Sequence, residues 1–258
     1  MTDLPSAVGE LVDVLAGLPG TIAVVLGGSH ALGSADTQSD WDLGLYYRGA
    51  IDLTALSAHG TVHPPGSWGR VMNGGAWLQC GGHKVDVILR DLDVVEHWTR
   101  CAEHGEFEVD NLLGYLAGIP TYTLTAELAS CRLLRGDRRG APPYPSKLMA
   151  SGAARWRFCR TFSLDCARMH AARGNAAGAM GHAARAVIEE GHARLCERGE
   201  WVCNEKRLIE AAGLTGVHAV LVRTPDLSSL VQWVDLVAHR LGVSPGDTSP
   251  WTDVRRKA

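Results

Sequence analysis

The fold is decided by residues 26–46, which read LGGSHALGSADTQSDWDLGLY. A short apolar run rich in β-branched residues, 22–26, leads into this stretch and stops at a glycine pair. A second apolar run, 43–47, closes it. Short apolar runs of this kind, bounded by glycine and polar residues, are typical of buried strands. We therefore predict two strands joined by a polar loop.

Two acidic residues, Asp40 and Asp42, lead into the second strand. Residues two apart in an extended strand point to the same face, so both carboxylates are expected to occupy one small space. Two like charges so close disfavour each other's ionised form unless a cation lies between them. Clustered carboxylate oxygens suit Mg²⁺, so the pair predicts a magnesium site.

The residues after the first strand, Gly27, Gly28 and Ser29, have the properties of a phosphate cradle. Glycine allows backbone conformations closed to other residues and lets a ligand approach the main chain. Ser29 adds a hydroxyl at the start of a short helix predicted over 29–34. Backbone N–H groups at such a helix start bind phosphate, so one segment supplies both an anion pocket and a metal anchor.

The pair Gly28-Ser29, followed after ten residues by Asp40-x-Asp42, resembles the signature of the DNA polymerase β-like nucleotidyltransferase superfamily. Within it, the chain looks most similar to the bacterial aminoglycoside- and lincosamide-type enzymes with a C-terminal helical domain. The resemblance implies two Mg²⁺ ions and a nucleoside triphosphate substrate, ATP being the first choice. Many relatives carry arginine where this chain has Leu32, so phosphate binding would differ at that position.

A third acid, Asp86, lies within a strand-like run, 83–89, that follows another run, 76–80, across a glycine pair. This pattern predicts a β-hairpin. A single carboxylate among apolar neighbours is costly to bury unpaired, so it either faces water on an edge strand or has a function. The resemblance implies that Asp40, Asp42 and Asp86 are the catalytic metal ligands and that Asp86 can deprotonate the acceptor hydroxyl.

The resemblance also suggests a nucleotide-binding set, which is Gly27, Gly28, Ser29, Ser39 and Lys206. The run Asn204-Glu205-Lys206 is similar to one at the start of a late helix in the bacterial enzymes, here predicted over 205–212. A lysine in the first helical turn opposes the helix dipole, so Lys206 either binds an anion or faces solvent. Further cations close to the carboxylate strands could counter phosphate charge or be simply solvated; they are Arg70, Lys84 and Arg90.

The chain changes character after residue 91, where helical periodicity dominates. We predict an α/β (α+β) fold with a nucleotidyltransferase catalytic domain at 1–105, containing a short mixed sheet, and an all-α helical bundle at 106–258. The proline- and glycine-rich residues 61–67 are expected to form a loop. The predicted helices are 4–18, 91–104, 107–117, 124–134, 146–172, 175–198, 205–212 and 227–241.

The composition excludes several classes of protein. The 258 residues carry a formal net charge of −3, so no broad basic field attracts nucleic acid or an anionic membrane. The sequence shows neither an apolar run of about 18 residues nor a secretory signal. The seven scattered cysteines form no CxxC pair, which favours reduced thiols and a cytoplasmic location.

Together with these patterns, the resemblance implies transfer of a nucleoside monophosphate to a hydroxyl of a small acceptor, with release of pyrophosphate. Antibiotic modification is one such activity. One alternative is a toxin-like or regulatory enzyme that modifies a protein or a tRNA. Another is a nucleotide-binding module without catalysis, although three intact carboxylates argue against it. No motif selects the acceptor, the nucleotide base or the oligomeric state.

Overall fold

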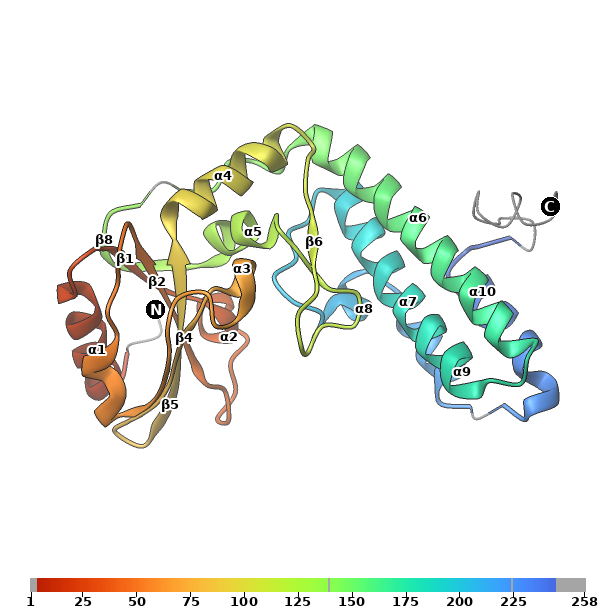
Figure 1. The fold of residues 1–258 in the computed structure, drawn as a ribbon, viewed down its shortest axis with the longest axis horizontal. Coiled ribbons are helices and arrows are strands. Elements are labelled where there is room, and N and C mark those ends of the chain that lie inside the picture. Colours follow the sequence, from red (N-terminus) through yellow and green to blue (C-terminus); the bar gives the residue numbers. More distant parts are fainter. Residues whose placement is uncertain (1–3, 139, 224, 245–258) are drawn as a thin grey trace. The chain divides into compact units, whose positions relative to one another are not determined.

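The computed structural model describes residues 4–138, 140–223 and 225–244, which form two compact units. The sheet unit comprises 4–102, 107–112 and 119–143, and the helical unit comprises 103–106, 113–118 and 144–244. Figure 1 labels their elements. This division differs from the predicted boundary between residues 105 and 106, because a strand formed after residue 130 belongs to the sheet.

The sheet unit contains a six-stranded sheet in the order β3-β4-β5-β2-β1-β8. β2 and β5 run parallel, whereas the other neighbouring strands are antiparallel. The predicted class, α/β with a mixed sheet followed by helices, is confirmed. The strands of this sheet are β1 (Thr21–Leu26), β2 (Trp41–Tyr47), β3 (Gly60–His63), β4 (Gly75–Cys80), β5 (His83–Asp91) and β8 (Arg132–Gly136).

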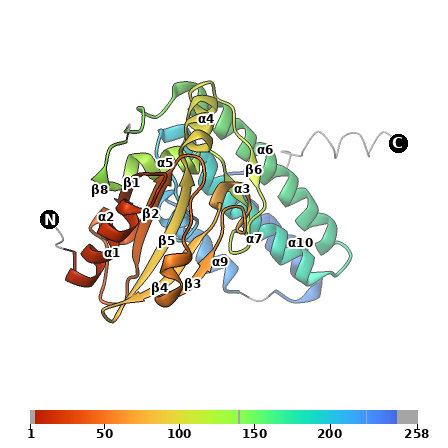
Figure 2. The same cartoon turned by 60° about the vertical axis from the view of Figure 1, so that its left-hand side comes forward.

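Helix α1 (Ser6–Gly17) covers one face of the sheet (Figure 2). Its apolar residues recur at helical spacing and are buried; they are Val8, Leu11, Val12 and Leu15. They pack against every second residue of the central strands, including Leu43 and Val87. Each such side chain contributes about 1.5–3 kcal/mol through burial. Because strand residues alternate, the residues between them point to the opposite face of the sheet.

Three sequence predictions between residues 61 and 134 are wrong. Instead of a helix over 107–117 the chain forms β6 (Val109–Asp110), which pairs with β7 (Ile119–Pro120), because glycines with positive φ interrupt any helix. The helix predicted over 124–134 ends at Ser130, and the remainder becomes β8, which pairs with β1. The predicted loop 61–67 supplies most of β3, an edge strand. The other helices before residue 131 are α2 (Gly28–Leu32), η1 (Thr54–Ala58), α3 (Gly69–Met72), α4 (Leu92–Glu103) and α5 (Thr123–Ser130).

The helical unit is built on two long helices, α6 (Ser146–Ala171) and α7 (Ala176–Arg198), as predicted. The Asn175 side chain caps α7 by accepting a hydrogen bond from the Gly178 N–H at 3.1 Å. Many buried residues on both helices are alanines, whose small side chains permit close packing. The shorter elements are α8 (Leu208–Ala211), η2 (Thr215–Val217), α9 (His218–Leu221), η3 (Leu227–Ser229) and α10 (Leu230–Arg240).

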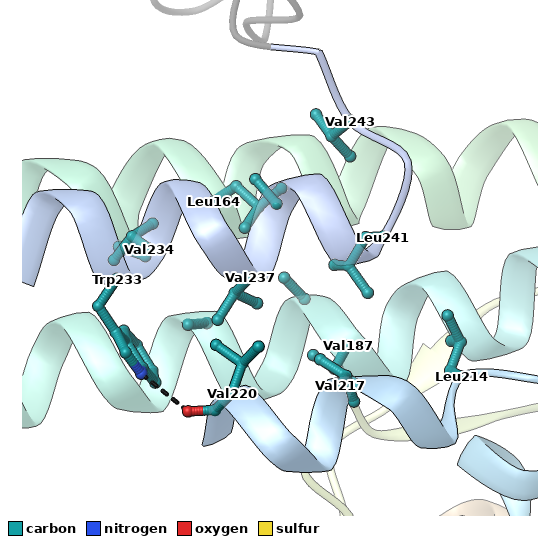
Figure 3. Packing of buried hydrophobic residues seen from close by; sticks show 14 of the residues in the cluster. Leu164, Val187, Leu214, Val217, Val220, Trp233, Val234, Val237, Leu241 and Val243 are labelled. Atoms are coloured by element: carbon teal, nitrogen blue, oxygen red, sulfur yellow. Dashed lines mark hydrogen bonds between the residues drawn. The ribbon is translucent and has the colours of Figure 1, made fainter. Parts of the chain in front are cut away.

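Helix α10 completes the core of the helical unit (Figure 3). Trp233 and Val237 of α10 lie in one cluster with Leu164 of α6 and Val187 of α7. The Trp233 Nε1–H donates to the Val220 carbonyl at 3.1 Å, so the buried indole keeps a polar partner. Within the ranges that the structure describes, every helix is too short or too polar to cross a lipid bilayer.

A buried histidine is expected to make the stability of the helical unit depend on pH. The His192 ring stacks on the Trp156 ring, with centroids 4.4 Å apart and planes 14° from parallel. Burial lowers the pKa of His192 from 6.5 to about 3. His192 therefore binds a proton near pH 6.5 in the unfolded chain but only near pH 3 in the folded chain. Stability that is present above pH 6.5 is lost as the pH falls through this interval.

We expect His192 to lower the free energy of unfolding by about 2 kcal/mol between pH 6.5 and pH 5, at about 1.4 kcal/mol per pH unit. His192→Phe keeps an aromatic ring against Trp156 and removes the titrating group, so its stability should fall less. Burial raises the pKa of Glu189, so this residue adds stability as the pH falls. Wild type and His192→Phe both contain Glu189, so its contribution cancels in the comparison. Urea unfolding at both pH values measures the difference, and parallel losses in the two proteins would contradict the assignment.

Candidate active site

Two acidic side chains lie side by side on the parallel pair of strands at the centre of the sheet. Asp42 of β2 is the register partner of Asp86 of β5. Neighbouring strands are separated by about 5 Å, and partners in register point to the same face. Trp41 and Leu43, on either side of Asp42, are buried in the core beneath α1, whereas Asp42 and Asp86 are half-buried. The structure thus brings together two of the three predicted carboxylates on the face away from α1.

The third predicted carboxylate, Asp40, lies just before β2 begins at Trp41 and is also half-buried. Among the residues that the structure describes, no group of three or more His, Cys, Asp or Glu side chains is arranged to hold a metal ion. Mg²⁺ commonly uses one or two carboxylates together with substrate phosphates and water. Asp42 and Asp86 therefore fit one such ion, and a site for two ions stays a prediction.

The glycine pair packs directly against Asp42. The Gly27 N–H donates to the Asp42 carbonyl at 2.8 Å, which ties the turn after β1 to β2. Gly28 has a φ of +58°, in the left-handed region. A Cβ atom at Gly28 would overlap Asp42 Oδ2 and lie 2.6 Å from its Cγ. Glycine is therefore needed at residue 28 both for the backbone conformation and for the place of the carboxylate.

Gly28→Ala is expected to displace the Asp42 carboxylate and to lower the nucleotidyl transfer that the sequence resemblance predicts by about 10²-fold, since a shift of about 1 Å at a reacting group has this effect. Gly33→Ala is the matched control, because Gly33 also has a positive φ, +69°, but no atom within 4 Å of an added Cβ. Both variants should lose about 1–2 kcal/mol of stability from backbone strain. Equal transfer rates in the two variants, measured by pyrophosphate release, would contradict this role of Gly28.

The loop before β2 is held by a small hydrogen-bond network around Asp36. The Asp36 carboxylate accepts from the Gln38 N–H at 2.9 Å and from the Ser39 hydroxyl at 3.0 Å, and these bonds lower the pKa of Asp36. His30 stacks on Trp41 with ring centroids 3.8 Å apart, and its Nε2 lies 3.4 Å from the Ser39 carbonyl oxygen. Ser39 thus has a structural role in the loop, and its predicted contact with nucleotide stays a prediction.

The Asn204-Glu205-Lys206 run lies in the helical unit, where the predicted helix 205–212 is wrong at its start. Helix α8 begins only at Leu208, so Lys206 lies in the preceding turn and is exposed. The Asn204 side chain accepts from the Lys206 N–H at 3.0 Å. Glu205 accepts the N–H groups of Leu116 and Ala117 at 2.8 and 3.0 Å. Part of the motif therefore fixes a loop, and nucleotide binding by Lys206 stays a prediction.

The three cations close to the carboxylate strands have different surroundings. Arg90 is buried and donates to Glu127 through Nε at 2.5 Å and Nη2 at 2.6 Å, so it serves the fold. Arg70 forms an ion pair with Glu108 at 2.5 Å. Lys84 is exposed on β5, two residues before Asp86. Of the three, Lys84 lies at an open position on the carboxylate face.

The structure adds one residue that sequence reasoning missed. Trp77 of β4 is the register partner of Asp86, so it lies on the same face as the carboxylates. The alternation of apolar residues from Ala76 to Cys80 could have revealed it, because Ala76, Leu78 and Cys80 are buried while Trp77 is exposed.

Comparisons with known proteins leave the chain without a family. No model of a protein family matches the sequence, and no curated protein matches it. The structure is similar to that of a nucleotidyltransferase-like protein from Exiguobacterium sibiricum 255-15, with 14% sequence identity and a TM-score of 0.46. The match covers 92% of this chain and 73% of that one. A likeness this weak assigns neither a family nor an activity.

Proposed function

We propose that the chain transfers a nucleoside monophosphate from ATP, or another nucleoside triphosphate, to a hydroxyl group of a small molecule. The observation that carries this proposal is the register of Asp42 and Asp86 on adjacent parallel strands, with the Gly28 backbone against the Asp42 carboxylate. Two acids and a glycine turn that converge on one place suit phosphoryl-transfer chemistry, since its catalysis is mostly positioning and charge neutralisation.

Asp42 and Asp86, joined by Asp40 on its adjoining loop, would hold Mg²⁺. When bound, Mg²⁺ neutralises charge on the triphosphate and on the leaving pyrophosphate. The N–H groups of Gly28 and Ser29 lie at the start of α2, where backbone donors have no partner within the helix, and would bind the β- and γ-phosphates. Ser39, on the loop before β2, would add a further contact to the nucleotide.

The reaction proceeds by displacement at the α-phosphorus. The acceptor oxygen forms a bond to this phosphorus, and the bond from the phosphorus to the oxygen bridging the α- and β-phosphates breaks. Pyrophosphate leaves with the electron pair of that bond. Asp86 takes the proton of the acceptor hydroxyl, and its half-buried position limits competition from water. The products are a nucleotidylated acceptor and pyrophosphate.

The acceptor we propose is a small hydroxylated molecule, with antibiotics of this kind among the candidates, and we place the reaction in the cytoplasm. A formal net charge of −3 supports a small acceptor over a polyanion such as RNA. The seven cysteines, all free thiols, support a reducing compartment.

A transfer assay tests the proposal. The full-length protein is incubated with each of the four nucleoside triphosphates, MgCl₂ and pools of hydroxylated small molecules that include antibiotics. Release of pyrophosphate is measured together with the mass of the product. We expect release that needs the metal, one nucleotide and one pool. Nucleotide binding without pyrophosphate release in any pool, or a labelled macromolecule as the only product, would overturn it.

A further inference from the structure

A row of side chains crosses three strands on the face of the sheet opposite α1. Trp77 of β4 is the register partner of Asp86 of β5, and Asp86 is the register partner of Asp42 of β2. Partners in register share a face, so the indole and both carboxylates point the same way. Neighbours in this row are separated by about one strand spacing, about 5 Å. An aromatic ring therefore lies next to the proposed reaction centre.

The Trp77 ring is held in place yet open to solvent. It packs against the Trp68 ring, with centroids 5.3 Å apart and planes 25° from parallel, and against the His63 ring at 4.5 Å. Gly75 permits the approach of Trp68, because a Cβ atom there would lie 2.9 Å from Trp68 Cζ3. Even so, 54% of Trp77 remains exposed. A large aromatic surface kept in contact with water beside two half-buried acids is suited to a ligand.

The strand order decides which reactant this ring would meet. β1 and the Gly28–Ser29 turn flank the Asp42–Asp86 pair on one side, and β4 flanks it on the other. In phosphoryl transfer the attacking and leaving oxygens lie roughly in line with the phosphorus. If pyrophosphate leaves toward Gly28, the acceptor must enter from the side of β4. Trp77 therefore lies where the acceptor approaches.

We infer that Trp77 binds the acceptor, and that the acceptor carries a saturated, hydroxylated ring such as that of a sugar or cyclitol. The C–H face of such a ring packs on an indole, while its hydroxyls point outward at the rim. A ring stacked on Trp77 can place one hydroxyl above Asp86, one strand away. Gln79 and Lys84, cross-strand partners that are both exposed, offer polar groups for the other hydroxyls. This inference rests on the proposed function.

The experiment measures binding without requiring transfer. Full-length protein without nucleotide is titrated with myo-inositol and with methyl α-glucopyranoside, with acyclic sorbitol as comparison, and contact is detected by saturation-transfer NMR. We expect signals on the ring C–H protons of the cyclic probes and weaker ones for sorbitol. Trp77→Ala should weaken binding of the cyclic probes about tenfold, and Trp77→Phe much less. Leu133→Ala, an exposed apolar residue on the opposite edge strand β8, should change nothing.

A second measurement separates acceptor from nucleotide. The dissociation constant of Mg-ATP, measured by calorimetry, should agree within about twofold between wild type and Trp77→Ala. Weaker Mg-ATP binding with unchanged probe binding would assign the ring to the nucleobase and overturn the inference. Unchanged binding of all ligands would overturn it as well. If the cyclic probes do not bind but pyrophosphate is released in the transfer assay, this inference alone is rejected. If no pyrophosphate is released in the transfer assay, the proposed function is rejected.

Discussion

Replacing Asp42 by asparagine is expected to lower nucleotidyl transfer by at least about 10³-fold while the fold survives. The two side chains have nearly the same shape, so packing against Gly28 is retained. The amide carries no charge and turns an N–H donor or a weaker oxygen toward a cation. Asp86 alone would then face the metal and the triphosphate, and charge neutralisation in the transition state would be incomplete.

The measurement is pyrophosphate release at saturating nucleotide and acceptor, together with urea unfolding of the same preparation. Asp13→Asn is the control, because Asp13 lies exposed on α1 in an ion pair with Arg135 on β8. Asp13→Asn removes one negative charge from the sheet unit, away from the proposed catalytic residues. Its transfer rate should therefore match that of wild type. Wild-type transfer by a folded Asp42→Asn protein would remove Asp42 from the catalytic centre.

The sequence predicted the parts of this site that depend on neighbours along the chain. The run TIAVVL, closed by Gly27 and Gly28, can form only a short buried strand and a turn, and both are present. The same is true of the strand at Asp42 and of the hairpin that carries Asp86. In each case the strand is predicted by apolar residues that recur with a period of two, and the turn by a pair of glycines.

The placement of Asp86 beside Asp42 could not be read from periodicity. Parallel pairing of β2 with β5 joins strands that are distant in sequence, and a shift of one residue would turn Asp86 toward the core. Family resemblance, not pattern, suggested this placement. For the same reason β8 was missed, since Arg132–Gly136 becomes a strand only because the edge of β1 is available to it.

Lys206 illustrates a different limit of prediction from sequence. A short motif was interpreted as the start of a helix, but Glu205 binds the backbone of residues 116 and 117 and delays the helix to Leu208. A carboxylate that accepts two backbone N–H groups is a tertiary contact, and no local propensity reveals it. Trp77 was missed for a different reason: alternation along β4 could have shown that it points away from the core, but only the pairing of β4 with β5 places it on the face of the acids.

Glu127→Ala is expected to destabilise the sheet unit by about 3–5 kcal/mol, because it removes the carboxylate that is ion-paired with the buried Arg90 guanidinium. Only 2% of the Arg90 side chain is exposed, and its Nε and Nη2 hydrogen bonds to Glu127 are short, at 2.5 and 2.6 Å. Arg90 also donates to the carbonyls of Met72 and Leu89, both at 3.0 Å, so it cannot turn outward without giving up these bonds. Urea unfolding followed by tryptophan fluorescence gives the free energy.

Two further variants separate the ion pair from its surroundings. Asp13→Ala breaks the exposed pair with Arg135 and should change stability by less than about 1 kcal/mol. The double variant Arg90→Met with Glu127→Leu fills the same space without charge, so it should be more stable than Glu127→Ala alone. It should still fall short of wild type, since the backbone carbonyls of Val71, Met72 and Leu89 lose a donor. A loss below about 1 kcal/mol in Glu127→Ala would mean that Arg90 reaches water or another partner, and that the pair does not anchor α5 to β5.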